Sequence, residues 1–124
     1  MQADQDKSGA RSPVKEMLGS AVERLNQSKL TRQGNIVLRL SGNGGGNYCL
    51  SHDSGKTTLR QLDAMSDQTP PLIEVSGDAQ IVYEIFEGKR NAFKQFLAGG
   101  LRLRGDLRYF SDLALEMKII DQPL

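Results

Sequence analysis

The sequence predicts one α/β (α+β) domain, in which amphipathic helices cover the apolar face of a β-sheet. The chain has 124 residues, which is enough to bury a single hydrophobic core and too few for two. Apolar residues recur at helical spacing near both ends of the chain, whereas apolar and polar residues alternate in the middle. Both kinds of surface must bury their apolar side, so the helices and the sheet are expected to pack as layers.

The N-terminal part of the chain is expected to hold a leader and a helix. Residues 1–11 are polar with mixed charge and predict a disordered leader, so residues 12–124 would form the domain. Ser12 and Pro13 mark a helix start, because a hydroxyl suits the N-cap and proline suits the first helical position. The apolar residues that follow form one stripe: Val14, Met17, Leu18, Ala21, Val22 and Leu25.

The middle of the chain has the pattern of strands separated by turns. Ile36, Leu38 and Leu40 recur at every second position, which gives one face for a core and one mostly for water. A glycine-rich turn is expected at 42–47, a second turn at 53–56 and a loop at 63–69. The expected strands are 36–41, 47–52, 57–62, 72–75 and, later in the chain, the half-exposed segment 101–104.

Three further helices are expected in the second half of the chain. Asp78, Asn91 and Asp106 each precede an apolar segment of helical period and carry the side-chain oxygen that caps a helix. Gly88 can end the first of these helices in a left-handed conformation, and the glycines at 99–100 can end the second. The strand 101–104 then separates the second helix from the last.

Composition and charge disfavour several functions. The net charge of +1 predicts no strong attraction to nucleic acid, and the lack of tryptophan weakens any platform for stacking bases. Cys49 is the only cysteine, so no intramolecular disulfide requires an oxidising compartment. No apolar run approaches the roughly 20 residues that span a bilayer, and residues 1–11 lack the apolar core of a signal peptide. A cytoplasmic protein is therefore expected, since residues 121–124 also do not match a peroxisomal address.

Sequence motifs for catalysis or cofactor binding are incomplete. Residues 54–57 (Ser-Gly-Lys-Thr) resemble the end of a phosphate-binding loop, but Leu50 stands where that loop needs glycine, so a hairpin turn is expected. The run 42–47 lacks the third glycine of a dinucleotide fingerprint and precedes a strand. Cys49 and His52 should point to opposite faces of a strand, which leaves Cys49 semi-buried and His52 at a solvated strand end. No metal, cofactor or catalytic residue is predicted.

Consecutive segments between Pro71 and Ile120 match one known order of elements. Residues 76–89 fit a strand that gives way to a helix closed by a Gly-Lys turn, and 91–100 fit a second helix and turn. Residues 101–106 fit a terminal strand that leaves through Gly-Asp, and 107–117 a closing helix. In this order they resemble the sterol carrier protein 2 (nonspecific lipid-transfer) domain family.

The resemblance implies a mostly antiparallel sheet of about five strands, covered by helices, with an apolar tunnel between the layers. The lack of a peroxisomal signal fits a bacterial stand-alone member of the family.

Two groups of residues are candidates for the site that the resemblance implies. Plain core packing accounts for at least half of the apolar group, and the sequence does not show which half. Phe93, Phe96 and Leu97 are its first candidates, because a short helix between glycine-bearing turns could move as a lid. The candidate cavity residues are Ile81, Ile85, Phe86, Phe93, Phe96, Leu97, Leu103, Leu113 and Met117.

The second candidate group is basic. Only one acidic residue, Asp106, lies among six basic residues between positions 89 and 108. These cations form either a solvated face or a patch at the tunnel mouth that attracts anionic headgroups or an acyl-CoA phosphate. They are Lys89, Arg90, Lys94, Arg102, Arg104 and Arg108.

These observations predict noncovalent binding of a lipid, fatty acyl chain, sterol or isoprenoid, with transfer or presentation as the role. The expected partners are that apolar molecule and, transiently, an anionic membrane surface. Neither nucleic acid nor a cofactor is expected. The alternative is a non-catalytic accessory module that organises a complex with an enzyme or a homodimer. A third interpretation is an enzyme whose active site the sequence does not reveal.

Overall fold

The computed structural model describes residues 13–28, 33–62 and 71–121. The expected leader at 1–11, the N-cap at Ser12 and the loop at 63–69 lie outside these ranges. The described residues form four helices and five strands. In chain order these are α2 (Pro13–Asn26), β2 (Gly34–Ser41), β3 (Gly46–Asp53), β4 (Lys56–Gln61), β5 (Ile73–Asp78), α3 (Ala79–Phe86), α4 (Ala92–Ala98), β6 (Leu101–Gly105) and α5 (Leu107–Glu116).

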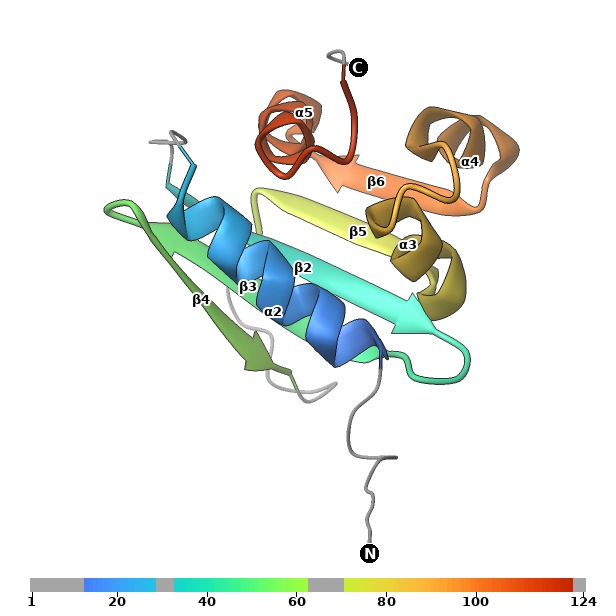
Figure 1. Ribbon diagram of the computed structural model, residues 1–124, viewed down its shortest axis with the longest axis horizontal. Helices are drawn as coiled ribbons and strands as arrows, with labels where there is room; N and C mark the ends of the chain where they lie inside the picture. The colour runs from blue at the N-terminus through green and yellow to red at the C-terminus, as the bar shows by residue number, and fades with distance from the viewer. Residues whose placement is uncertain (1–12, 29–32, 63–70, 122–124) are drawn as a thin grey trace, which may run out of the picture.

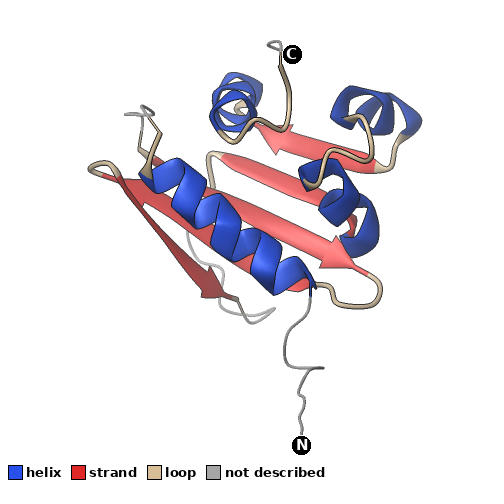
Figure 2. Ribbon diagram, in the orientation of Figure 1, coloured by secondary structure: helices blue, strands red, loops and turns tan. Residues whose placement is uncertain are grey.

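The strands form one open sheet in the order β4-β3-β2-β5-β6 (Figures 1 and 2). The pairs β2–β3, β3–β4 and β5–β6 are antiparallel, and β2–β5 is parallel. This confirms the prediction of a mostly antiparallel five-stranded sheet in an α+β fold. β6 is one edge of the sheet, and β4 is the other.

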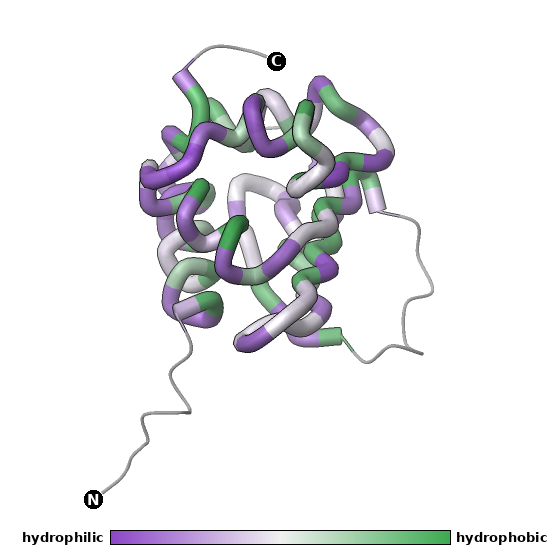
Figure 3. Tube along the Cα trace, turned by 90° about the vertical axis from the view of Figure 1, so that its right-hand side faces the viewer, coloured by the Kyte–Doolittle hydropathy of each residue, from purple (hydrophilic) through white to green (hydrophobic). Residues whose placement is uncertain are grey.

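One face of the sheet is apolar and carries the core. Ile36 of β2 pairs with Leu50 of β3 and with Ile73 of β5, so three buried side chains form one row across the strands. α2 and α3 lie over this face (Figure 1). Hydrophobic and hydrophilic residues alternate along the tube in Figure 3, which is how each element turns an apolar side inward and a polar side outward.

α2 begins at Pro13 and buries the apolar stripe that its sequence predicts, with Val22 only partly buried. Its C-terminal end is tied to the sheet, because Asn26 Oδ1 accepts a hydrogen bond from the backbone N–H of Thr57 at 2.7 Å.

Arg24, which lies off the stripe, makes two long-range contacts. Its Nη1 donates to the carbonyl of Met117 at 2.7 Å, and its guanidinium lies 4.2 Å from the centre of the Phe86 ring. Arg24 therefore joins the C-terminal ends of three helices.

Replacing Arg24 by glutamine should lower the free energy of unfolding by about 1 kcal/mol. The change removes an exposed cation–π contact and a charge-assisted hydrogen bond at a helix C-terminus, which are each worth less than about 1 kcal/mol near solvent. Urea denaturation monitored by circular dichroism measures the loss. The neighbouring change Glu23→Gln is the control and should cost much less. Equal losses for the two variants would contradict the role given to Arg24.

The caps of the later helices follow the sequence prediction. Asp78 accepts hydrogen bonds from the backbone N–H groups of Gln80 and Ile81, at 2.8 and 3.3 Å. Asn91 caps α4 and Asp106 caps α5 in the same way. Each acceptor satisfies an N–H that the first helical turn leaves without an intrahelical partner. The helix ends are also as expected, because Gly88 and the C-cap of α4 at position 99 have φ of 81° and 86°.

The expectation that His52 lies at a solvated strand end is wrong. The residue is 1% exposed, and its Nδ1 lies 2.6 Å from the hydroxyl of Thr57 on β4. His52 pairs with Gly34 on the other neighbouring strand, and both pairs lie on the helix-covered face. The hydroxyl satisfies one ring nitrogen, so the ring can be buried. Cys49 is buried on the opposite face, in agreement with the predicted separation of the two side chains.

Within the described residues, no helix is both long and apolar enough to cross a membrane.

Candidate ligand-binding site

An apolar cavity of about 80 Å³ lies in the core between the sheet and the helices. Every side chain that lines it is hydrophobic. α2, α3, α5 and four of the five strands contribute most of the wall, and the three remaining residues are Ala92 at the start of α4 and Met117 and Ile119 in the segment after α5. The lining residues are Met17, Leu18, Ala21, Ile36, Leu38, Leu50, Val75, Val82, Ile85, Phe86, Ala92, Leu101, Phe110, Leu113, Met117 and Ile119.

Four of the nine residues predicted to line a cavity do line it: Ile85, Phe86, Leu113 and Met117. Ile81 and Leu103 pack against the core but do not reach the cavity. The three first candidates, on α4, lie elsewhere.

Those three residues point away from the core. Phe93, Phe96 and Leu97 are 51%, 37% and 68% exposed, and Ala92 is the buried residue of this seven-residue helix. The spacing of three and four residues does place the large side chains on one side of α4. Their exposed fractions show that this side faces solvent. α4 therefore presents an exposed apolar face.

Sequence reasoning missed the contribution of the sheet and of α2 to the cavity. Met17, Leu18 and Ala21 belong to the stripe that predicts the buried side of the first helix, and Leu38 belongs to the predicted core face of a strand. The periodicity that assigns these residues to the core could have included them. It could not show that a space remains at their ends, because that depends on how two layers meet.

Beside the cavity lies a second hollow, an open groove of about 840 Å³ between the α3–α4 turn and the segment that follows α5. Ala92 and Ile119 line both hollows, so they form the wall between the groove and the cavity. We call the larger hollow the basic groove. Its lining residues are Gly88, Lys89, Arg90, Asn91, Ala92, Phe93, Lys94, Lys118, Ile119, Ile120 and Asp121.

The six cations of the predicted basic patch do not lie together in the structure. Lys89, Arg90 and Lys94 line the basic groove, where Lys118 joins them. Sequence reasoning missed Lys118, because it lies outside the basic run and reaches the groove only through the fold. The exposed Arg108 is on α5 and does not line the groove.

The other two predicted cations are on β6, on the face of the sheet opposite the core. Along β6, Leu101 and Leu103 take the core side, so Arg102 and Arg104 take the other. Glu74 of β5 faces the same side and pairs with Arg39 at 2.7 Å and with Arg104 at 3.8 Å. These arginines therefore form a separate charged surface.

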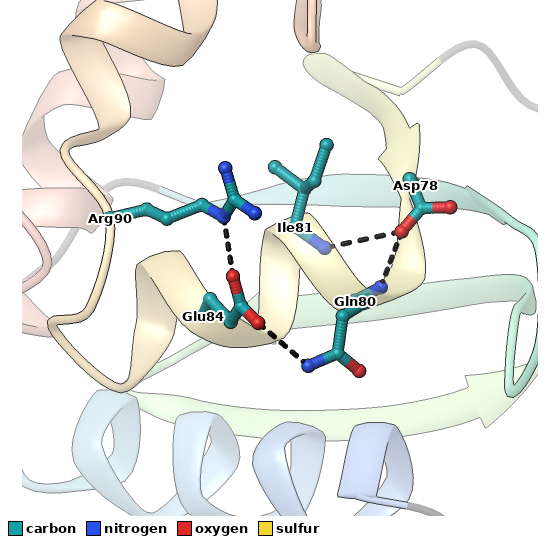
Figure 4. A network of polar contacts seen from close by, with 5 residues as sticks. All are labelled: Asp78, Gln80, Ile81, Glu84 and Arg90. Carbon is teal, nitrogen blue, oxygen red and sulfur yellow. Dashed lines mark hydrogen bonds and ion pairs between the residues drawn. The ribbon is translucent and has the colours of Figure 1, made fainter.

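A polar network fixes one cation of the basic groove (Figure 4). Glu84 of α3 accepts hydrogen bonds from the Gln80 side-chain amide, at 2.8 Å, and from Nε of Arg90. These two bonds, with the Gln80 bond contributing most, lower the pKa of the Glu84 carboxyl from its ordinary value despite a small opposing effect of desolvation. Glu84 is therefore ionised at neutral pH and holds Arg90 at the start of the groove.

Among the residues that the structure describes, no three or more His, Cys, Asp or Glu side chains come together as a metal site. The cavity is lined by apolar side chains alone, whereas the groove combines cations with apolar residues. The first kind of wall suits noncovalent binding of apolar chains, and the second suits anions.

Comparison with known proteins identifies the fold. No protein-family model and no curated protein matches the sequence. Among solved structures, a double mutant of the sec-alkyl sulfatase PisA1 matches with a TM-score of 0.69 and 15% identity over 85% of this chain. The match spans only 16% of the sulfatase chain.

Two further matches extend over nearly the whole of the other protein. A crystal structure of sterol carrier protein 2 has a TM-score of 0.60 and 15% identity, covering 88% of this chain and 96% of that one. Sterol carrier protein 2 from Aedes aegypti, in complex with palmitate, has a TM-score of 0.63 and 15% identity, covering 86% and 94%. The chain thus has the sterol carrier protein 2 fold, as its sequence predicts.

Proposed function

We propose that this chain, which has the sterol carrier protein 2 fold, binds the hydrocarbon part of a lipid noncovalently in the cavity between its sheet and its helices. The observation that carries the proposal is the all-apolar lining of that cavity by both layers of the fold. Burial of hydrocarbon contributes about 0.8 kcal/mol per methylene group, so an acyl chain would supply its own affinity. The palmitate in the Aedes aegypti protein supports this ligand class.

The cavity must widen for such a ligand. Its volume is about 80 Å³, whereas pockets that hold small molecules measure about 300–1,000 Å³. α4 is the part best suited to move, because it is short, buries only Ala92 and lies between the glycines at 88 and 99–100. Its displacement would let Phe93, Phe96 and Leu97 turn onto the bound chain. Carriage or presentation of the lipid would follow, without bond chemistry.

Binding is tested directly with the purified full-length chain. Organic extraction followed by mass spectrometry should recover an apolar molecule at near-stoichiometric amount, or added palmitate should raise the thermal midpoint in a concentration-dependent manner. Delipidated protein that shows no shift with palmitate, hexadecanol or cholesterol would contradict the proposal.

We also propose that α4 meets an anionic membrane during transfer. Phe93, Phe96 and Leu97 form an exposed apolar face, and Lys89 and Lys94 lie next to it. An apolar face flanked by lysines suits the boundary between lipid headgroups and acyl chains. The exposed arginines of β6 would not join this contact, since they belong to the other face of the sheet.

The combined change Lys89→Gln and Lys94→Gln should lower binding to vesicles of phosphatidylserine and phosphatidylcholine roughly 30-fold at low salt. Each cation near an anionic bilayer is worth about 1 kcal/mol, and two such losses correspond to this factor. Vesicle co-sedimentation measures it. The matched control, Arg102→Gln with Arg104→Gln, removes the same charge and should lower binding much less. An equal loss in both variants would place the membrane contact elsewhere.

The alternative is an accessory module within a complex. One observation favours it: the same fold makes up 16% of a sulfatase chain, so this fold also occurs as a part of an enzyme. Under this alternative the cavity stays closed to ligands, and light scattering would find a stable homodimer or a complex. Ligand binding by a monomeric protein would contradict it.

A further inference from the structure

We infer that the basic groove holds the anionic head of a long-chain amphiphile, whose chain reaches the core cavity between Ala92 and Ile119. The inference rests on the proposed function and deepens it, because it names the chemical class of the ligand and the path of its chain. It gives a role to the groove, to Lys118 and to the wall between the two hollows. Binding in the cavity alone requires none of these.

The charge of the groove selects an anion. Lys89, Arg90, Lys94 and Lys118 line it, against one carboxylate, that of Asp121. Glu84 lies outside the lining; it forms an ion pair with Arg90 and attracts Lys89 at longer range, and the groove keeps a net positive charge. Three lysines therefore remain to attract a negative group, and a neutral sterol would leave them without a partner.

The apolar part of the groove continues toward the cavity. Phe93, Ile119 and Ile120 line the groove beside the cations, so the site is amphiphilic. Ala92 and Ile119 border both hollows. Alanine is the smallest side chain that could form this wall, and Ile119 is only partly buried. A chain whose head lies among the lysines would therefore reach the core between these two residues.

Lys118 is held toward this groove by an unusual backbone conformation. It has φ of 61°, in the left-handed region where glycine is the usual residue after a helix. The backbone N–H groups of Lys118 and Ile119 donate to the carbonyls of Leu115 and Ala114, at 3.1 and 2.9 Å, which closes α5 with a Schellman motif. Glycine would satisfy this motif at lower strain. The lysine adds no bond to the motif, and its side chain supplies a cation at the groove.

Two sources share the inferred chemistry, a fatty acid carboxylate and a lipid phosphate. The experiment compares palmitate, hexadecyl phosphate and hexadecanol, which have the same chain length and differ in the head. Isothermal titration calorimetry on the full chain should give tighter binding of both anions than of the alcohol. Tighter binding of hexadecyl phosphate than of palmitate assigns a phosphate head, and the reverse order assigns a carboxylate.

Charge reversal then locates the head. Lys94→Glu with Lys118→Glu should weaken palmitate binding about tenfold or more and leave hexadecanol binding within about twofold. The matched control, Lys56→Glu with Arg60→Glu, reverses two exposed charges on β4, the strand at the opposite edge of the sheet from β6, and should change neither ligand.

Lys118→Gly separates function from folding. It should keep or raise the thermal midpoint, because glycine suits the left-handed position, and it should still weaken palmitate binding. A purely structural role for Lys118 would leave that affinity unchanged.

Ile119→Trp should slow association of palmitate and hexadecanol alike, since both chains use the same passage, and unchanged rates would place the passage elsewhere.

The outcomes distinguish the inference from the proposal beneath it. Equal affinity for palmitate and hexadecanol, unaffected by the charge reversals, would overturn the groove as a head site and leave apolar binding intact. Failure of all three C16 ligands to bind the unmodified chain would overturn both.

Discussion

Ala21→Leu should stabilise the ligand-free protein and strongly weaken its binding of acyl chains. Ala21 is a buried residue of α2 that lines the cavity, and leucine places three more carbon atoms there. Empty core volume costs about 24 cal/mol per Å³, so filling a cavity of about 80 Å³ would raise the free energy of unfolding by up to about 2 kcal/mol. Urea denaturation of the delipidated variant measures this gain.

The same three carbons exclude three methylene groups of a ligand. At about 0.8 kcal/mol for each, the affinity for palmitate should fall roughly 50-fold. Titration calorimetry measures the affinity. The control is Ala114→Leu, at a fully buried alanine of α5 that does not line the cavity. It should overpack the core and cost about 1–3 kcal/mol. A destabilised Ala21→Leu protein that still binds palmitate normally would place the ligand outside this cavity.

Local signals in the sequence predicted most of the fold correctly. Asp78, Asn91 and Asp106 cap their helices as expected, because a cap depends on the few backbone N–H groups that follow it. The strands and turns were predicted for a related reason: alternation and glycine act over a few residues. The family resemblance supplied the order in which these elements pack, which short-range patterns do not contain.

Predictions about side-chain environment were less successful, because burial depends on distant residues. His52 stands near the end of its strand, yet it is 1% exposed and its ring is hydrogen-bonded to Thr57 of a neighbouring strand. Phe93 and Leu97 belong to a regular apolar face, but that face is exposed in the folded chain. No periodicity within one helix contains this information.

The composition of the cavity and the groove also depends on residues that are distant in the sequence, which limits its prediction in the same way. Lys118 joins Lys89 and Lys94 although about a quarter of the chain separates them, because the turn after α5 returns beside the α3–α4 turn. Charge counted along the sequence instead grouped Lys94 with Arg102 and Arg104. The alternation of a strand sends those arginines to the far face. Lys118 could have been found by a search that counted the cations just after the last predicted helix together with those of the turn after the helix that begins at Asp78.

Leu113→Ala should have the opposite effect to filling the cavity, with a large loss of stability that ligand partly restores. Leu113 is 1% exposed on α5 and lines the cavity. Truncation of a buried leucine costs about 2–5 kcal/mol, because transfer energy is lost and a larger void remains. A domain with an ordinary stability of about 5–15 kcal/mol would stay folded in most of this range.

The enlarged cavity should accept an acyl chain with less rearrangement than the unmodified one. Saturating palmitate should therefore raise the thermal midpoint of Leu113→Ala by more than it raises that of the unmodified protein, since a ligand that binds only the folded state stabilises it by an amount that grows with the logarithm of its affinity. Differential scanning calorimetry with and without palmitate measures both increments.

Leu25→Ala is the matched control, because Leu25 is fully buried in the same core but does not line the cavity. It should lose stability in the same range, about 2–5 kcal/mol, and gain no additional response to palmitate. If the two variants respond to palmitate alike, the effect of Leu113→Ala is general softening of the core, and the acyl chain does not occupy the space that Leu113 leaves.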